Sequence, residues 1–312
     1  MVDRNLRIIF MGTPEFALAS LEILLDAGYL IVGVVTAPDK TGGRGLQQKI
    51  ISPVKSFALE KGLKVLQPAN LKSKEFINEL RSLKADLQIV VAFRMLPRVD
   101  WNMPPKGTMN LHGSLLPAYR GAAPIQWAII NGETKTGVTT FLLQHEIDSG
   151  NLIAKREIPI LEKDDAGTLH DRMMHAGAGL VLGSVDLIAS GNIKEEPQDN
   201  SKISHAPKIH HEDGHIDWSK PVDVVYNLIR AMSPFPGAWT KLDEKDLKIF
   251  KAKKYSDQHN HPQGTITVND RKIIVQAIDG ELELTELQLA GKKRMTASDF
   301  LNGYKIKDWR AT

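Results

Sequence analysis

The sequence predicts an α/β protein, with a mostly parallel sheet covered by helices on both faces and then a small β-barrel or sandwich. Two observations predict it. Up to about residue 190, short apolar runs alternate with helical segments, as in repeated strand–helix units. Beyond Gly191, short alternating segments separated by turns such as Asp279-Gly280 take over. The length of 312 residues fits two domains.

In the first half, apolar runs predict the strands, and capping residues and helix breakers set the helix ends. Thr13 is expected to cap the first helix, Pro14 suits its first turn, and Gly28 ends it. The expected strands are Leu6–Phe10, Leu30–Thr36, Lys64–Leu66, Leu87–Ala92, Thr108–Leu111, Gly137–Leu143 and Asn151–Ile158. After the first helix, the expected helices are Pro53–Gly62, Lys74–Leu83, Ala123–Ile130 and Ala166–Ala189.

The second half begins with a polar, aperiodic stretch, Asn192–Glu212, which is typical of a linker. We therefore expect a first domain over residues 1–190, a linker over 191–208 and a second domain over 209–312. The elements expected after the linker are helices at Pro221–Met232 and Thr296–Asn302 and strands at Ala238–Leu242, Leu247–Ala252, Thr265–Val268, Lys272–Ala277 and Leu282–Leu289.

Composition excludes several classes of protein. The chain has no cysteine, which rules out disulfides, thiolate nucleophiles and cysteine-ligated metals. No apolar run reaches 18 residues, and Met1–Phe10 lacks the layout of a signal peptide, so we expect a cytoplasmic protein. Lys+Arg 40 against Asp+Glu 37 gives a net charge of +3. This charge permits a local basic patch, but a protein that covers itself with nucleic acid usually has a larger excess of basic residues.

Several familiar motifs are absent. The first strand–helix turn carries only Gly12, so it lacks the three glycines of a dinucleotide site. No Gly-Lys-Ser/Thr follows the glycines near residue 43, which excludes a P-loop. Leu116 breaks the Gly-x-Ser-x-Gly pattern around Ser114, against a serine hydrolase. A polar loop holds His210, His211 and His215 without helical spacing, so no metal site is expected.

The densest chemical signal is Asn110-Leu111-His112-Gly113-Ser114 at the end of an expected strand. Period-two geometry puts Asn110 and His112 on one face, at the edge where open α/β sheets bind ligands. An amide donor beside an imidazole can stabilise an oxyanion while the imidazole handles a proton. The alternative is a buried histidine with satisfied hydrogen bonds, but the shaped loop that follows favours a site.

A second signal is Asp148-x-Gly150, just after another expected strand. Asp148 would orient His112 if the two strand ends are adjacent, and would favour its protonated form. Taken alone, such a pair of residues in a turn is more often structural.

Two kinds of basic segment stay open to two interpretations. Lys40, Arg44 and Lys49 flank glycines in a loop, which is either a solvated loop or a flexible cationic arm for a phosphate-rich ligand. The second domain carries the groups Lys251–Lys254 and Lys292–Arg294, which form either a solvated face or a surface that follows a nucleic-acid backbone.

Taken in order, these motifs resemble the folate-dependent formyltransferases, and most closely the branch that acts on methionyl-tRNA. The likeness rests on Met11–Phe16, the glycine–arginine loop, Asn110-x-His112-Gly113-Ser114-Leu115-Leu116-Pro117, Arg120–Gln126, Asp148-x-Gly150, Ile216–Trp218 and Leu289–Met295. It covers nearly the whole chain. The Asn-x-His…Asp set is common to the family, so it indicates the chemistry rather than the acceptor.

The resemblance implies a Rossmann-like domain and an OB-like barrel that contacts tRNA. It implies formyl transfer from 10-formyltetrahydrofolate to the α-amine of methionine on initiator tRNA, without a metal, by an enzyme expected to be monomeric. Asn110, His112 and Asp148 would be catalytic, Ser114, Leu115, Leu116 and Pro117 would line the folate site, and Lys40, Arg44 and Lys49 would hold the tRNA.

One segment departs from the family pattern. Phe93–Pro97 replaces a tyrosine–glycine pair and a longer apolar run found in many relatives, at a loop that could border the folate. An amino-sugar or purine-precursor amine is the alternative acceptor, against which the second domain argues. A non-catalytic nucleic-acid-binding protein is the third hypothesis, and the Asn110/His112 loop argues against it.

Overall fold

The computed structural model describes residues 3–42, 48–242, 244–256, 261–304 and 310–311. The chain forms two compact units, and both take up separate stretches of sequence. The first contains residues 1–121, 137–158 and 170–205, and the second contains residues 122–136, 159–169 and 206–312. Among the described residues, no helix combines the length and apolar character needed to cross a bilayer.

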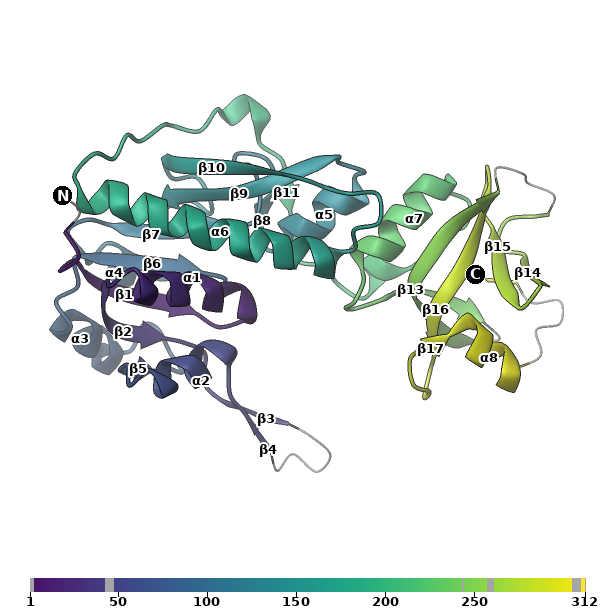
Figure 1. The fold of residues 1–312 in the computed structure, drawn as a ribbon, viewed down its shortest axis with the longest axis horizontal. Helices are drawn as coiled ribbons and strands as arrows, with labels where there is room; N and C mark the ends of the chain where they lie inside the picture. The colour runs from purple at the N-terminus through teal and green to yellow at the C-terminus, as the bar shows by residue number, and fades with distance from the viewer. Residues whose placement is uncertain (1–2, 43–47, 243, 257–260, 305–309, 312) are drawn as a thin grey trace. The chain divides into compact units, whose positions relative to one another are not determined.

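The first unit is built on a seven-stranded sheet (Figure 1). In sheet order its strands are β10 (Leu152–Pro159), β9 (Lys135–Leu142), β7 (Thr108–His112), β6 (Leu87–Val91), β1 (Arg7–Gly12), β2 (Leu30–Val35) and β5 (Val65–Leu66). From β5 to β7 every pairing is parallel, and β9 runs antiparallel to β7. The predicted mostly parallel sheet is confirmed, and β10 lies next to β9 at its edge.

Helices cover both faces of this sheet. Phe76 and Leu80 of α3 belong to one buried cluster with Ile9 and Met11, alternate residues of β1. Figure 1 shows α1 and α6 side by side on one face of the sheet. The ring of Phe16 in α1 lies 5.1 Å from that of His170 in α6. The helices of this unit are α1 (Glu15–Asp26), α2 (Pro53–Glu60), α3 (Lys74–Ser82), α4 (Arg98–Trp101) and most of α6 (Ala166–Ala189), whereas α5 (Pro124–Ile130) belongs to the second unit.

The start of α1 corrects one prediction. Pro14, not Thr13, is the N-cap residue, and no side chain caps this helix. The Thr13 hydroxyl instead accepts a hydrogen bond from the Ala37 amide, which ties the end of β1 to the segment after β2. Ser52 and Ser73 do cap α2 and α3 through their hydroxyls.

A short hairpin, β3 (Lys40–Gly42) and β4 (Gln48–Ile50), stands where the sequence predicted only a loop. Two further short strands, β8 (Arg120–Gly121) and β11 (His205–Ala206), lie at points where the chain passes between the units. The polar stretch around residues 192–212 also contains two short 3-10 turns, Asn200–Lys202 and Glu212–Gly214.

The second unit is β-rich, as predicted. Its strands are β12 (Ala238–Leu242), β13 (Lys245–Ser256), β14 (Ile266–Asn269), β15 (Lys272–Gln276), β16 (Glu281–Leu289) and β17 (Met295–Thr296). All the pairings in this sheet are antiparallel, and irregular register along β13 gives the long strand the bends that a curled sheet needs. Helices α7 (Val222–Ala231) and α8 (Ala297–Gly303) pack their apolar residues on its core around Trp218 and Leu287.

Candidate active site

Asn110 and His112 lie at the carboxyl end of β7, in the middle of the sheet. Asn110 pairs with Val90 of parallel β6, and His112 pairs with Thr139 of β9. The His112 side chain is 7% exposed. Asn110 is half-buried, and within the described ranges its side-chain amide has no recorded hydrogen-bond partner. An amide in this state is available to a ligand.

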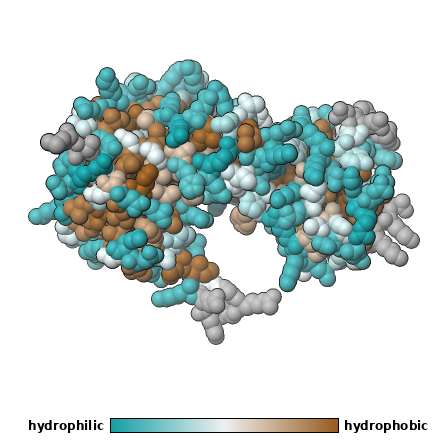
Figure 2. Space-filling view, in the orientation of Figure 1, coloured by the Kyte–Doolittle hydropathy of each residue, from teal (hydrophilic) through white to brown (hydrophobic). Residues whose placement is uncertain are grey.

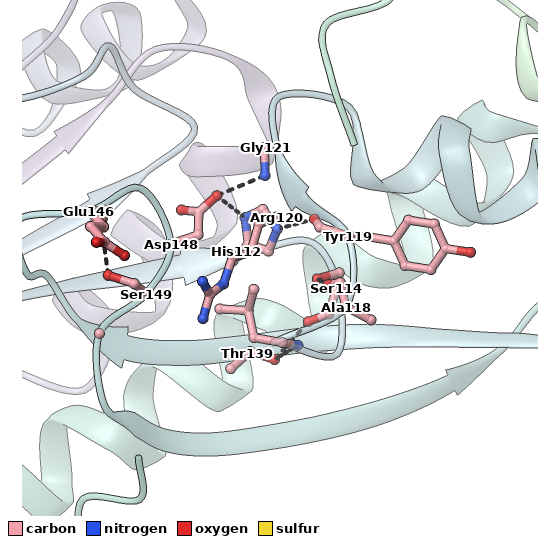
Figure 3. Close-up of polar contacts among 12 residues, drawn as sticks. His112, Ser114, Ala118, Tyr119, Arg120, Gly121, Thr139, Glu146, Asp148 and Ser149 are labelled. Atoms are coloured by element: carbon pink, nitrogen blue, oxygen red, sulfur yellow. Dashed lines mark hydrogen bonds and ion pairs between the residues drawn. The ribbon is translucent and has the colours of Figure 1, made fainter. Parts of the chain in front are cut away.

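Both nitrogens of His112 face defined groups (Figure 3). Its Nε2 lies 2.8 Å from the carbonyl oxygen of Tyr119. Because a carbonyl oxygen only accepts, Nε2 carries a hydrogen, and the neutral ring keeps its lone pair on Nδ1. Nδ1 faces Asp148 Oδ2 at 3.7 Å, which is an ion-pair distance rather than a hydrogen bond. The structure thus brings His112 and Asp148 together, but not through adjacent strand ends. β9 runs antiparallel to β7 and its last residue, Leu142, pairs with Met109 near the start of β7, so the segment after β9 has to turn back toward His112.

The carboxylate of Asp148 is fixed by backbone rather than by the imidazole. Its Oδ2 accepts a hydrogen bond of 2.9 Å from the Gly121 amide, and its side chain is 12% exposed. Figure 3 shows the carboxylate between that amide and the ring of His112. The backbone amide of Gly121 therefore fixes the position of the carboxylate oxygen that faces Nδ1.

Both residues that face His112 have left-handed backbones. Tyr119 has φ +59° and Asp148 has φ +51°, a region that non-glycine residues seldom adopt. Such conformations cost on the order of 1–3 kcal/mol each and collect at functional sites, where surrounding contacts hold them. The ring of Tyr119 points away from the imidazole, so its carbonyl is the group that matters (Figure 3).

Close packing explains why the Asp148-x-Gly150 pattern ends in glycine. A Cβ at this position would lie 1.6 Å from the carbonyl oxygen of Leu142. The turn that carries Asp148 is thus pressed against the last residue of β9, and only glycine permits this approach.

Sequence reasoning missed Gln198, which holds the same turn. Its Nε2 donates to the carbonyl oxygens of Asp148 and Gly150, at 2.8 and 2.9 Å. Its Oε1 accepts from Nη2 of Arg120 at 2.6 Å and from Nε at 3.2 Å. Gln198 lies in the polar segment interpreted as a linker, where no pattern marks it.

Ser114, Leu115, Leu116 and Pro117 form a tightly tied loop after β7. Ser114 and Leu116 are fully buried, and Pro117 is also buried. The Ser114 hydroxyl donates to the Ala118 carbonyl at 2.6 Å, while Leu116 donates its amide to Thr139 Oγ1. Only Leu115 is half-buried, so a ligand beside this loop would meet Leu115 or the backbone.

The loop after β6 begins at the same edge of the sheet as His112, because β6 and β7 are parallel neighbours. Within it Met95 is 73% exposed, and Phe93 is half-buried. The guanidinium of Arg94 is held by the carbonyls of Pro68 and Ala69, so it fixes the loop. The other side chains of this loop are apolar.

Comparisons with known proteins identify the family of this chain. A protein-family model described as formyl transferase matches residues 6–184, and one described as formyl transferase, C-terminal domain, matches residues 208–305. A methionyl-tRNA formyltransferase of Parabacteroides distasonis is 52% identical, over 98% of this chain and 98% of that protein. The chain belongs to the methionyl-tRNA formyltransferase family. A relative with the same name from Flavobacterium johnsoniae is 49% identical over 97% of the chain and 98% of its own length.

Solved structures share the fold of this formyltransferase at lower identity. HypX from Aquifex aeolicus in complex with tetrahydrofolic acid has a TM-score of 0.68 at 18% identity, covering 97% of this chain and 50% of its own, so the chain spans about half of HypX. An N-formyltransferase from Helicobacter canadensis, in complex with folinic acid and dTDP-3-aminofucose, has a TM-score of 0.67 at 21% identity over 89% of this chain and 98% of its own.

The hairpin of this formyltransferase carries two of the three expected tRNA-binding cations. Lys40 and Lys49 are exposed, whereas Arg44 lies outside the described residues. Lys40 pairs with Ile50 and Lys49 with Thr41, so the two lysines lie on opposite faces of the ribbon. Ile50 is 56% exposed, and apolar surface is visible beside the hairpin (Figure 2).

In the second unit, some of the basic side chains form ion pairs with acidic side chains. Arg294 and Lys251 both contact Glu286, and Lys254 contacts Asp223. Among the residues that the structure describes, Lys253, Lys292 and Lys293 have no recorded ion pair.

The histidine cluster of the sequence does not come together as a set of ligands. His211 stacks on Trp239, with ring centroids 4.7 Å apart, and His215 contacts the same ring at 4.5 Å. No group of three or more His, Cys, Asp or Glu side chains in the described part of the chain could hold a metal ion.

Proposed function

We propose that the protein transfers the formyl group of 10-formyltetrahydrofolate to the α-amine of methionine on initiator methionyl-tRNA. One observation carries this proposal: His112 is held between the Asp148 carboxylate and the Tyr119 carbonyl, beside the available amide of Asn110. The family membership supplies the substrates, because relatives about half identical over nearly the full chain carry the name methionyl-tRNA formyltransferase.

The reaction needs no nucleophile from the protein. An α-amine with a pKa of about 8 is partly neutral at pH 7, so it can attack the formyl carbonyl directly. A carbon–nitrogen bond forms, the carbonyl electrons move to oxygen, and the side-chain amide of Asn110 donates to that oxyanion.

His112 and Asp148 handle the proton. The Nδ1 lone pair of His112 takes the proton that the attacking amine loses, and the facing carboxylate stabilises the resulting imidazolium. When the oxyanion collapses, the bond from the formyl carbon to N10 breaks, and this proton passes to N10 of the leaving tetrahydrofolate. Charge and atoms balance without a covalent enzyme intermediate.

The folate would lie at the carboxyl edge of β6 and β7. Its flat ring suits the apolar side chains there, Met95, Phe93 and Leu115, while the buried Ser114 and Leu116 keep the loop in shape. HypX, which shares this fold, was solved in complex with tetrahydrofolic acid, and this supports a folate as the donor.

The tRNA would be held by exposed cations. Lys40 and Lys49 offer charge on both faces of the hairpin, and Lys253, Lys292 and Lys293 offer it in the second unit. With this role we propose that the enzyme acts in the cytoplasm as a monomer, in one step of translation initiation.

One assay tests the proposed function. Purified protein is incubated with 10-formyltetrahydrofolate and charged initiator tRNA, and the product is analysed for formyl-methionine. Elongator methionyl-tRNA and a nucleotide-linked amino sugar serve as alternative acceptors. Formylation of the initiator tRNA in preference to both is the expected result, and preferential formylation of the amino sugar would refute the proposal.

A further inference from the structure

Residues 195–204, here named the strap, lie against both turns that face His112. Strap residue Glu196 makes two backbone hydrogen bonds with Leu152, which anchor the strap beside β10. Further along, Gln198 donates to the carbonyls of Asp148 and Gly150. Ser204 then accepts from the Tyr119 amide through its hydroxyl, at 2.9 Å, and from the Arg120 amide through its carbonyl, at 2.9 Å.

These contacts fall on the two left-handed residues. Asp148 and Tyr119 supply the carboxylate and the carbonyl that face His112, and both have positive φ. A strained backbone persists only where its surroundings hold it. The strap supplies that hold, since Gln198 bonds the carbonyl of Asp148 and Ser204 bonds the amide of Tyr119.

Arg120 links the two turns through Gln198. Its side chain is buried, with the whole residue 8% exposed, and it points its guanidinium at Gln198 Oε1. The next residue, Gly121, donates the hydrogen bond that fixes Asp148 Oδ2. Both the backbone and the carboxylate of Asp148 are therefore tied to one short stretch of chain.

A glutamine fits this place for a chemical reason. The side chain must donate twice, to the carbonyls of Asp148 and Gly150, and accept at the same time from Arg120. Only an amide does both. A carboxylate at residue 198 would keep the contact with Arg120 but would face two carbonyl oxygens with lone pairs.

We propose that Gln198 is a positioning residue of the formyl-transfer reaction, which sets the Asp148 carboxylate against His112, and that Ser204 does the same for the Tyr119 carbonyl. The proposal rests on the proposed function for its kinetic test. Gln198 touches no reacting atom; it acts through the turn that carries Asp148.

The kinetic test compares Gln198→Ala with Glu195→Ala. Glu195 is on the same strap, but its carboxylate contacts only the exposed Asn151 side chain, so it is the matched control. We expect kcat of Gln198→Ala to fall about 10- to 100-fold, with KM for both substrates within about twofold, because a misplaced group costs rate rather than binding. Glu195→Ala should match the wild type. A Gln198→Ala enzyme with unchanged kcat, or with a raised KM only, would overturn the proposal.

A double-mutant cycle separates positioning from general damage. If Gln198 acts through Asp148, removing it in an Asp148→Asn background should lower kcat by less than about twofold. Full additivity of the two losses would show that Gln198 acts elsewhere. Gln198→Glu should fail to rescue Gln198→Ala, whereas rescue by glutamate would point to a simple partner for Arg120.

A spectroscopic measurement tests the same idea without turnover. The ring nitrogens of ¹⁵N-labelled His112 report the groups that face them, so their chemical shifts should move in the same direction in Gln198→Ala and Asp148→Asn. Unmoved shifts in Gln198→Ala would overturn the proposal even if the wild type formylates another acceptor. Failure of the wild type on methionyl-tRNA, with moved shifts, would instead overturn only the proposed function.

Discussion

At the scale of single residues, unfavourable backbone conformations fix the groups that face His112. Tyr119 and Asp148 each adopt a left-handed conformation, and each presents one group to His112. A flexible loop could offer the same groups, but it would have to order them for each turnover. Here the hydrogen bonds from Gly121 and Gln198 hold Asp148 in position before a substrate arrives.

Asp148→Asn tests the role of this carboxylate. The amide keeps the size of the side chain and an oxygen for the Gly121 amide, so the fold should be retained. It removes the charge that stabilises a protonated His112, and kcat should fall at least about 100-fold, as for the loss of acid–base catalysis. Single-turnover formylation measures this.

Asp217→Asn is the matched control for Asp148→Asn, because Asp217 is an exposed carboxylate that accepts from Ser219 in the second unit. It loses the same charge and should turn over like the wild type. Near-normal formylation by Asp148→Asn, with its fold intact by circular dichroism, would contradict the assignment.

Asp100 gives a prediction about stability. It is fully buried in α4, neither carboxylate oxygen has a hydrogen-bond partner within the described residues, and burial raises its pKa from the ordinary 3.8 to about 6. A raised pKa in the folded state means that the protonated acid is the favoured form there. The stability contributed by that proton is complete below pH 3.8 and is lost as the pH rises through 6.

Asp100→Asn should therefore stabilise the protein only where Asp100 is ionised. At pH 8 we expect its free energy of unfolding to exceed that of the wild type by about 2–3 kcal/mol, from the size of the pKa change. Near pH 4 the two proteins should unfold alike. Urea unfolding at both pH values measures the difference, and a gain that is equal at both would contradict the burial argument.

At the scale of elements, the sequence predicts the strands and helices that a local residue pattern determines. It does not predict the features that depend on contacts with residues distant in the sequence. Apolar runs such as Leu87–Val91 form strands because both faces of a parallel sheet are buried. The hairpin β3–β4 has no such run, since its strands are short and polar. The Thr13 hydroxyl does not cap the helix; it accepts a hydrogen bond from the amide of Ala37, a residue that is distant in the sequence.

The candidate site divides in the same way. Asn110, His112 and Asp148 follow strands, and the rule that ligands gather at carboxyl ends indicated them. The approach of His112 to Asp148 could not be predicted from the sequence, because it depends on how the segment after the antiparallel β9 turns back toward β7. Gln198 and Ser204 lie in a polar stretch without period, and only the folded chain gives them partners. Neither residue type nor spacing distinguishes them from solvated loop residues.

The hairpin gives the prediction that belongs to this scale. Replacing Lys40 and Lys49 by alanine should weaken tRNA binding, because each exposed lysine would neutralise about one phosphate and release a counterion. The slope of log Kd against log salt should become shallower by about 1 for each lysine. Filter binding at several salt concentrations measures this.

Lys106→Ala is the control for the hairpin lysines. Lys106 is equally exposed, but it lies just before β7, at the sheet edge opposite His112. Its removal should leave the affinity unchanged. A hairpin variant that binds tRNA with the wild-type salt slope would favour the solvated-loop interpretation.

At the scale of the whole molecule, a net charge of +3 is compatible with a polyanionic partner because cations can gather locally while acidic side chains balance the charge elsewhere. Acidic side chains neutralise much of the second unit's basic surface: Glu286 contacts Lys251 and Arg294, and Asp223 contacts Lys254. Local patches of this kind bind through a few phosphates, and the rest of the surface does not attract nucleic acid.

The salt dependence of turnover should show this limited number of contacts. With Lys40, Lys49, Lys253, Lys292 and Lys293 as the cations that contact tRNA, the slope of log KM for tRNA against log salt should be about 4. The KM for the small folate donor should change by less than about twofold over the same range, and kcat at saturating tRNA should stay constant. Steady-state kinetics between about 50 and 200 mM salt measure all three. A slope near zero would mean that tRNA is held without these cations, and a slope of about 6 would mean that Lys251 and Arg294, which contact Glu286, also bind phosphates.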